Sequence, residues 1–242
     1  MSDKSPPEAK TKIGLDELSE DMFGLSIRAF RTLRGVIIAP KRVYKAARTP
    51  DWQAHSFTPS IRLSFSLLAV MVAIRFLWVG PDSFLAQSTY DQLLASGVYD
   101  QADARRVAED IIETFLVVFP IGFLVMHMIM AACLFIWGKG TELAVRLRLY
   151  FVAILPNLML TLVTLPLIGS ANLASYASVT AGLVFCTFLL DFITAFRGGV
   201  GGVSRLVRGA KSALFGGVSL IVTILANSIS YAIASAFVTG TL

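Results

Sequence analysis

Four ionisable side chains lie inside or at the edges of long apolar stretches of this chain: Arg75, Glu113, His127 and Asp191. Charged groups are costly in hydrocarbon, so such residues are candidates for ion, proton or substrate sites. Arg75 and Glu113 stand near the adjoining ends of two consecutive stretches. We therefore expect them to lie at similar depth and to form an ion pair that joins two helices.

Asp191 and three further polar residues complete the candidate set. Asp191 stands near one end of its stretch, within reach of basic residues there: Arg62, Arg148 and Arg208. His127, Asn157 and Asn227 lie nearer the middle of their stretches and can form one polar cluster. Such groups join helices through hydrogen bonds worth about 1 kcal/mol or less, but a small transporter or channel would use the same residues. Both interpretations stay open.

Catalytic patterns are not evident. The sequence shows no Ser/His/Asp, Cys/His or paired-carboxylate constellation, and a histidine without nearby carboxylates or thiolates is a poor metal site. The glycines from Gly198 to Gly202 resemble a phosphate loop, but no strand precedes them and no Gly-Lys-Ser/Thr follows. We expect a simple connection there, no enzymatic activity, no metal and no cofactor.

The composition indicates a lipid environment. Of the 242 residues, 55% are hydrophobic and 15% are charged, against about 45–50% and about 25% in soluble domains. We divide the chain into a polar, disordered tail (1–20), a cytoplasmic basic helix with its linker (21–60) and a membrane domain (61–242). The net charge of +5 then marks cytoplasmic flanks rather than a nucleic-acid partner.

Five apolar stretches approach the roughly 20 residues that a helix needs to cross a bilayer. Because every backbone amide in lipid must be bonded within its own segment, we predict an all-α membrane bundle with five spans. The predicted spans are Leu63–Val79, Thr114–Trp137, Leu149–Ile168, Leu173–Phe196 and Ala213–Val238.

The distribution of Lys and Arg predicts the orientation. Basic residues precede the first predicted span and join spans two to three and four to five, whereas the connection 80–110 is acidic. The N-terminus should therefore be cytoplasmic and Leu242 on the opposite side. Within the connection 80–110, Asp100 is placed to cap a helix that runs on into the second span.

A basic amphipathic helix is predicted between Met22 and Ile38. Apolar residues recur there at helical spacing (Phe23, Ile27, Phe30 and Ile37), and three arginines are interleaved with them (Arg28, Arg31 and Arg34). Such a helix can lie among anionic lipid headgroups, or it can pack on its own membrane domain. In the first case, replacing the arginines by Gln weakens binding to anionic vesicles by about 1 kcal/mol per charge.

Small residues recur at four-residue steps in the last two predicted spans. One such stripe lies in span four and two lie in span five: Ala174, Ser178, Gly182, Cys186; Ala226, Ser230, Ala234; Ser228, Ala232, Ala236. Small residues let membrane helices approach closely, within one chain or between chains. Self-association or association with other membrane proteins is therefore expected.

The block from Phe30 to Trp78 resembles the entry segment of a widespread bacterial membrane family of unknown function. The shared features are a helix, a proline with basic residues (Pro40, Lys41, Arg42) and a second proline, Pro59, just before span one. The zinc ribbon that often precedes that family is absent here. The plan of a cytoplasmic N-terminal region followed by clustered spans also resembles the Yip family, which is implicated in vesicle trafficking and membrane shaping through partners.

The resemblance implies a role without catalysis and carries no functional residues. Our leading hypothesis is an integral membrane scaffold or adaptor of the bacterial inner membrane that organises partners and contacts anionic lipid. The alternatives are a small transporter or channel, and an accessory subunit of a larger membrane complex.

Overall fold

The computed structural model describes residues 27–49, 57–78, 84–138, 140–169, 173–202 and 204–241, without the side chains of 75–78, 166–169 and 173–176. The predicted tail 1–20 and the first residues of the predicted amphipathic helix lie outside these ranges. All regular structure in the described ranges is helical, which confirms the predicted all-α class. The helices are α2 (Ile27–Ile38), α3 (Pro40–Ala47), α4 (Ser60–Trp78), α5 (Phe84–Ala95), α6 (Gln101–Cys133), α7 (Leu143–Gly169), α8 (Leu173–Gly198) and α9 (Arg205–Thr239).

Four helices are long and apolar enough to cross a membrane, namely α6, α7, α8 and α9. Helix α4 is also apolar, but its described side chains end at Ile74, and that shorter stretch does not meet the same length. The chain is therefore a multi-pass helical membrane protein.

Helix α6 begins where the sequence predicted. Asp100 is the N-cap, and its Oδ1 accepts a hydrogen bond of 2.8 Å from the Asp103 amide. At 33 residues, α6 is about 50 Å long, which exceeds a hydrocarbon core of about 30 Å. Its charged first turns therefore extend beyond the apolar zone and pair with α5.

Helix α7 forms the centre of the bundle. Every residue from Leu149 to Leu158 is buried, whichever side of the helix it occupies. A helix that is apolar on all sides is stable only when neighbours cover all of it. Here α4, α6 and α8 pack along α7, and α2 and α3 cover its beginning.

Small residues set the crossing of α6 and α9, the most extensive helix pair of the described chain. The predicted stripe Ala226, Ser230 and Ala234 is buried. A Cβ atom on Gly122 of α6 would lie 2.5 Å from the Ser230 hydroxyl oxygen. Of the other stripes, the described residues Ser178, Gly182, Cys186, Ser228 and Ala232 are exposed, so these stripes are not buried in a helix crossing as Ala226, Ser230 and Ala234 are.

Replacing Gly122 by leucine is expected to destabilise the protein by about 2 kcal/mol, because the larger side chain forces α6 and α9 apart. Thermal unfolding of the purified protein in detergent measures the loss. Gly182→Leu is the matched control, since nothing lies within 4 Å of a Cβ atom at that helical glycine. Equal losses in the two variants would show that the crossing does not depend on the absence of a side chain at Gly122.

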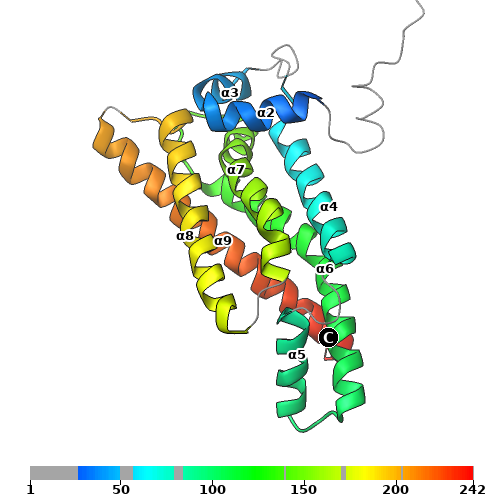
Figure 1. Cartoon of the computed structure of the whole chain (residues 1–242). Coiled ribbons are helices and arrows are strands. Elements are labelled where there is room, and N and C mark those ends of the chain that lie inside the picture. Colours follow the sequence, from blue (N-terminus) through cyan, green and yellow to red (C-terminus); the bar gives the residue numbers. More distant parts are fainter. Residues whose placement is uncertain are drawn as a thin grey trace, which may run out of the picture.

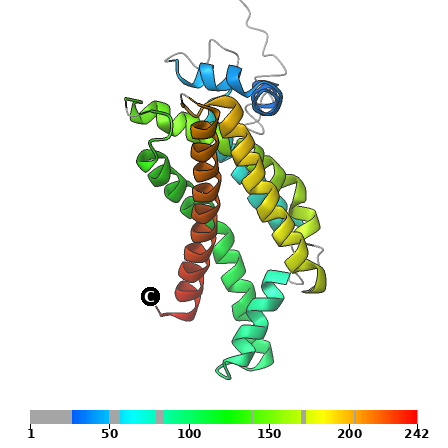
Figure 2. The same cartoon turned by 90° about the vertical axis from the view of Figure 1, so that its left-hand side faces the viewer.

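The two ends of the bundle differ in what covers them. Helices α2 and α3 lie across one end, whereas α5, the beginning of α6 and the end of α9 occupy the other (Figure 1). The view turned by 90° shows the same arrangement (Figure 2). At the α2 and α3 end, Arg197 at the end of α8 donates hydrogen bonds of 3.2 Å to the carbonyls of Ile37 and Ile38. These bonds satisfy two carbonyls at the end of α2.

Candidate functional site

A hydrogen-bonded polar group lies inside the bundle at His127. The ring is fully buried, its Nδ1 lies 2.9 Å from the Tyr150 hydroxyl, and its Nε2 lies 3.3 Å from the Thr223 hydroxyl. Thr223 donates its own proton to the Ser219 carbonyl, at 2.9 Å. The Thr223 oxygen is then left to accept from Nε2, so the network assigns a neutral imidazole protonated at Nε2 that accepts from Tyr150.

Asp191 forms a second polar group in the same interior. It is fully buried in α8, and the Asn157 amide donates to its Oδ2 over 3.5 Å. The Ser219 hydroxyl lies beside both Asp191 and Tyr150, so it links the two groups. Among the described residues, neither Asp191 Oδ1 nor the Ser219 oxygen has a hydrogen-bond partner. Together these residues form what we call the interior polar cluster: His127, Tyr150, Asn157, Asp191, Ser219 and Thr223.

The arginines expected near Asp191 have other partners. Arg148 donates to the Thr49 carbonyl at 2.9 Å, and the Arg208 guanidinium lies 5.6 Å from the centre of the Phe196 ring. The described neighbours of Asp191 are the amide of Asn157 and hydroxyl groups, all of them neutral. The expected interaction with Arg148 or Arg208 is therefore wrong, because both guanidinium groups lie closer to the end of the bundle.

The expected cluster of His127, Asn157 and Asn227 is only partly assembled. His127 and Asn227 both contact Thr223, since the Asn227 amide donates to the Thr223 carbonyl at 2.8 Å. Asn157 instead contacts Asp191. Sequence reasoning missed Tyr150, Ser219 and Thr223. One signal was available, because Ser219, Thr223 and Asn227 recur at four-residue steps and so form a polar stripe along one face of α9.

The predicted ion pair of Arg75 and Glu113 stays a prediction. Glu113 is exposed on α6, whereas the side chain of Arg75 lies outside the described residues. An exposed carboxylate near the charged beginning of α6 carries a smaller desolvation cost than a buried one.

Tyr44 of α3 packs against the glycines that end α8. Cβ atoms built on Gly198 and Gly199 would both collide with the buried ring of Tyr44. Arg48, the residue directly after α3, donates to the Gly199 carbonyl at 3.1 Å and holds the same contact. Burial raises the pKa of the Tyr44 hydroxyl well above its ordinary value, and any negative charge on Asp191 acts in the same direction. The first two glycines of the predicted loop therefore serve close packing rather than phosphate binding.

The arginines of α2 lie on its exposed face, together with apolar residues. Ala29, Thr32, Leu33 and Val36 form the buried face, and the Thr32 hydroxyl accepts a 2.8 Å hydrogen bond from the Thr58 amide. On the opposite face, large apolar side chains are exposed beside Arg28, Arg31 and Arg34: Ile27, Phe30, Ile37 and Ile38. One face of the helix therefore packs on its own bundle, which is one of the two expected arrangements, and the predicted amphipathic residues are exposed on the other face.

A pocket of about 460 Å³ opens beside this exposed face. Its lining contains three arginines, Arg31 and Arg34 from α2 and Arg42 from α3. The other described residues that line it are Gly35, Ile38, Ala39 and Phe57. The volume lies within the range of about 300–1,000 Å³ typical of small-ligand sites. Arginine is the side chain best suited to bidentate contacts with phosphate, so we name this feature the arginine pocket.

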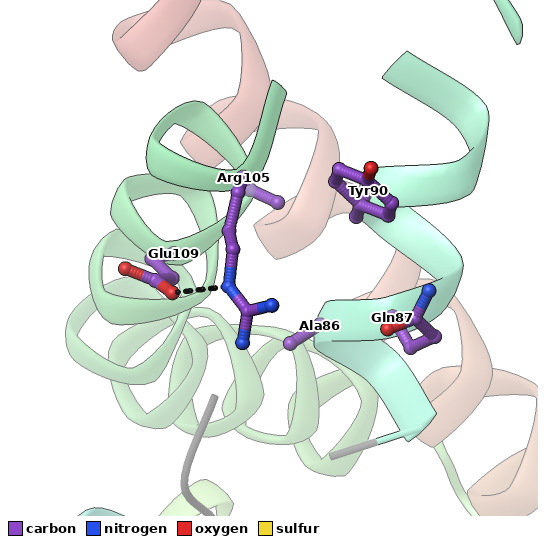
Figure 3. A pocket seen from close by; sticks show the side chains of 6 residues that line it. Ala86, Gln87, Tyr90, Arg105 and Glu109 are labelled. Carbon is purple, nitrogen blue, oxygen red and sulfur yellow. Dashed lines mark hydrogen bonds and ion pairs between the residues drawn. The ribbon is translucent and has the colours of Figure 1, made fainter. Parts of the chain in front are cut away.

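A second pocket between α5 and α6 is too small for a ligand. In Figure 3, Arg105 of α6 lies between Glu109 of the same helix and the residues Ala86, Gln87 and Tyr90 of α5. Its volume of about 10 Å³ corresponds to at most one water molecule. Arg105 and Glu109 form an exposed ion pair at 3.4 Å, and such pairs contribute about 0–1 kcal/mol.

Fold and site together define an integral membrane protein with several apolar spanning helices, a polar interior and a basic surface at one end. Within the described ranges, no group of three or more His, Cys, Asp or Glu side chains is placed to hold a metal ion. The chain matches no protein-family model, and it matches neither a curated protein nor a solved structure.

Proposed function

We propose that this protein is a non-enzymatic membrane scaffold that binds anionic lipid headgroups through α2 and α3. The observation that carries the proposal is the exposed face of α2, where Phe30 is 79% exposed and lies among arginines. Exposed aromatic and aliphatic groups combined with guanidinium groups suit the boundary between acyl chains and phosphates. Its buried face fixes α2 across the bundle end, so the exposed residues stay at one depth.

The arginine pocket supplies the chemistry for headgroup binding. Arg31, Arg34 and Arg42 reach it from two helices that meet at Pro40. At Gly35 the helices are close, because a Cβ atom there would lie 2.9 Å from a methyl group of Val43. Three positive charges around a concave surface attract a phosphate more strongly than isolated charges on a flat one. The ligand class that follows is a phospholipid with a net negative headgroup.

Orientation and span number belong to the same proposal. Helix α4, with 19 residues and a length of about 28 Å, would be the first of five spans. We place the N-terminus and the α2 and α3 end in the cytoplasm of a bacterial inner membrane, where Lys and Arg are enriched. A relationship to the Yip family and association with partner proteins are further proposals, which the clustered spans and exposed apolar surfaces favour.

Reporter fusions test the orientation. We expect a reporter that is active only in the cytoplasm to be active when inserted between Gly138 and Arg148 and silent at the C-terminus, because the basic residues gather at the first position. Activity at the C-terminus together with silence at the internal site would rule out five spans with a cytoplasmic N-terminus.

Lipid binding is tested with the full-length protein in detergent. We expect phosphatidylglycerol to raise the unfolding temperature, whereas phosphatidylcholine has a smaller effect. Replacing Arg31, Arg34 and Arg42 together by Gln is expected to weaken phosphatidylglycerol binding by more than about 3 kcal/mol, the loss that diffuse attraction of about 1 kcal/mol per charge would give. Native mass spectrometry of retained lipid measures the same loss independently.

The matched control carries three changes on the same helices outside the pocket. Arg28, Lys41 and Lys45 are exposed and do not line it. Arg28→Gln, Lys41→Gln and Lys45→Gln together should weaken binding less than the pocket variant. Equal losses would mean diffuse charge attraction with no pocket. Unchanged binding in both variants would overturn the lipid proposal and assign the exposed face of α2 to a protein partner.

A further inference from the structure

The interior polar cluster contains a buried carboxyl group that lipid binding does not use. Asp191 is fully buried in α8, more than a helical turn away from Gly198 at the end of that helix. An ionised carboxylate without a compensating charge is strongly unfavourable in such a place. The group must therefore be neutralised by a cation or by a proton.

The side chains that lie beside Asp191 are neutral and therefore do not compensate a negative charge on it. Helix α7 presents Tyr150 and Asn157 to it, α9 presents Ser219 and α3 presents Tyr44, and all four side chains are neutral. Three arginines on or directly after these helices interact elsewhere. Arg48 binds the Gly199 carbonyl, Arg148 binds the Thr49 carbonyl and Arg208 stacks on Phe196.

We propose that Asp191 is an intramembrane proton-binding site, connected to His127 through Ser219 and Tyr150. The geometry supports a proton because the side chains of Asp191 and Ser219 are adjacent, and neither Asp191 Oδ1 nor Ser219 Oγ has a hydrogen-bond partner in the described part of the chain. A proton on Oδ1 lets that atom donate to the Ser219 oxygen, so one proton satisfies both atoms.

The donors and acceptors are then consistent along the whole chain of groups. Ser219, having accepted from Asp191, donates to the Tyr150 oxygen beside it. Tyr150 donates to His127 Nδ1 over 2.9 Å, and His127 Nε2 donates to Thr223. Each of these groups can accept one proton while releasing another, which is the property that a proton relay requires. Four helices contribute, so the relay exists only in the folded bundle.

Infrared spectroscopy of the full-length protein provides the direct test. We expect the carbonyl stretch of a protonated carboxylic acid at neutral pH, and its loss in Asp191→Asn. Ser219→Ala keeps the carboxyl group but removes its acceptor, so the band should move to higher frequency. Should Asp191→Asn fail to fold, this second variant still decides the assignment. Absence of the band in the native protein, or its persistence in Asp191→Asn, would overturn the proposal.

Thermal unfolding gives a second readout with a defined sign. A group that holds its proton only in the folded state makes the folded state bind more protons, so stability falls as pH rises above the ordinary range of aspartate. Relative to Asp191→Asn, the native protein should lose about 3–5 °C in unfolding temperature per pH unit as pH rises above about 4, for as long as the folded state keeps its proton. Parallel curves for the two proteins would contradict proton binding.

A matched salt comparison separates a proton from a metal cation. We expect sodium chloride and choline chloride at equal ionic strength to give the same unfolding temperature in the native protein. Stabilisation by sodium that disappears in Asp191→Asn would overturn the proposal in favour of a sodium site. None of these measurements involves α2, so failure here leaves the lipid proposal standing, and failure of lipid binding leaves this site standing.

Discussion

Replacing Gly199 by alanine is expected to destabilise the protein by about 3 kcal/mol, because the added methyl group collides with the buried ring of Tyr44. The Gly199 backbone is not in the left-handed region, so the cost arises from the collision alone. Relief requires α3 to move away from the end of α8. That movement would also break the hydrogen bond from Arg48 to the Gly199 carbonyl, and thermal or denaturant unfolding in detergent measures the total loss.

A double-mutant cycle separates the collision from a general weakening. We expect Gly199→Ala combined with Tyr44→Ala to cost less than the sum of the single changes, because the second substitution removes the ring that the first one strikes. Gly209→Ala is the control, since nothing lies within 4 Å of its Cβ position and alanine favours helix by about 1 kcal/mol. Additive losses would show that Gly199 and Tyr44 do not press on each other.

Replacing Tyr150 by alanine is expected to cost about 3 kcal/mol, the lower end of the range for deleting a buried aromatic ring. The ring centre lies 5.3 Å from that of Phe215, 5.9 Å from that of Phe151 and 6.3 Å from that of Trp137. Lipid is as apolar as this interior, so the loss comes from packing and the remaining cavity rather than from transfer to water. Denaturant unfolding of the purified protein is the measurement.

Two further variants separate the contribution of the Tyr150 hydroxyl group from that of its buried ring. Tyr150→Phe keeps the ring but leaves His127 Nδ1 without its donor, which should cost about 1–2 kcal/mol. Phe185→Ala removes a ring that is 62% exposed, and its effect should stay below about 0.5 kcal/mol. If Phe185→Ala costs as much as Tyr150→Ala, the aromatic residues around Tyr150 are not the centre of the core.

Patterns among residues close in sequence correctly predicted the helical class, the start of one helix and one close helix crossing. The cap at Asp100, the helical class and the gathering of basic residues around one end all depend on residues close in sequence, and the structure contains each of them. The small-residue stripe at Ala226, Ser230 and Ala234 also predicted a close crossing. The stripe Ser228, Ala232 and Ala236 has the same spacing in the sequence, and only the position of α6 decides which of the two stripes is buried.

The polar interior shows what required the tertiary structure. The sequence identified His127, Asn157 and Asp191 as unusual because a polar group in an apolar run is visible from composition alone. Which of them meet depends on the depth and rotation of four helices, and a helix rotates by about 100° per residue, so a small error in register changes every partner. Tyr150 and Ser219 are common residue types that become informative only once packing places them beside Asp191.

The sequence by itself therefore determined that the chain is a membrane protein, that it is helical and that one end is basic. Hydrophobicity and charge are properties of single residues and can be read without knowing any contact. Only the tertiary structure decided that Tyr44 packs against Gly198 and Gly199. It also decided that Arg31, Arg34 and Arg42 line one pocket, and that the side chains around the buried Asp191 are neutral. The physical reason is that contact energies act over a few ångströms between residues far apart in sequence. Their partners exist only after the helices have packed.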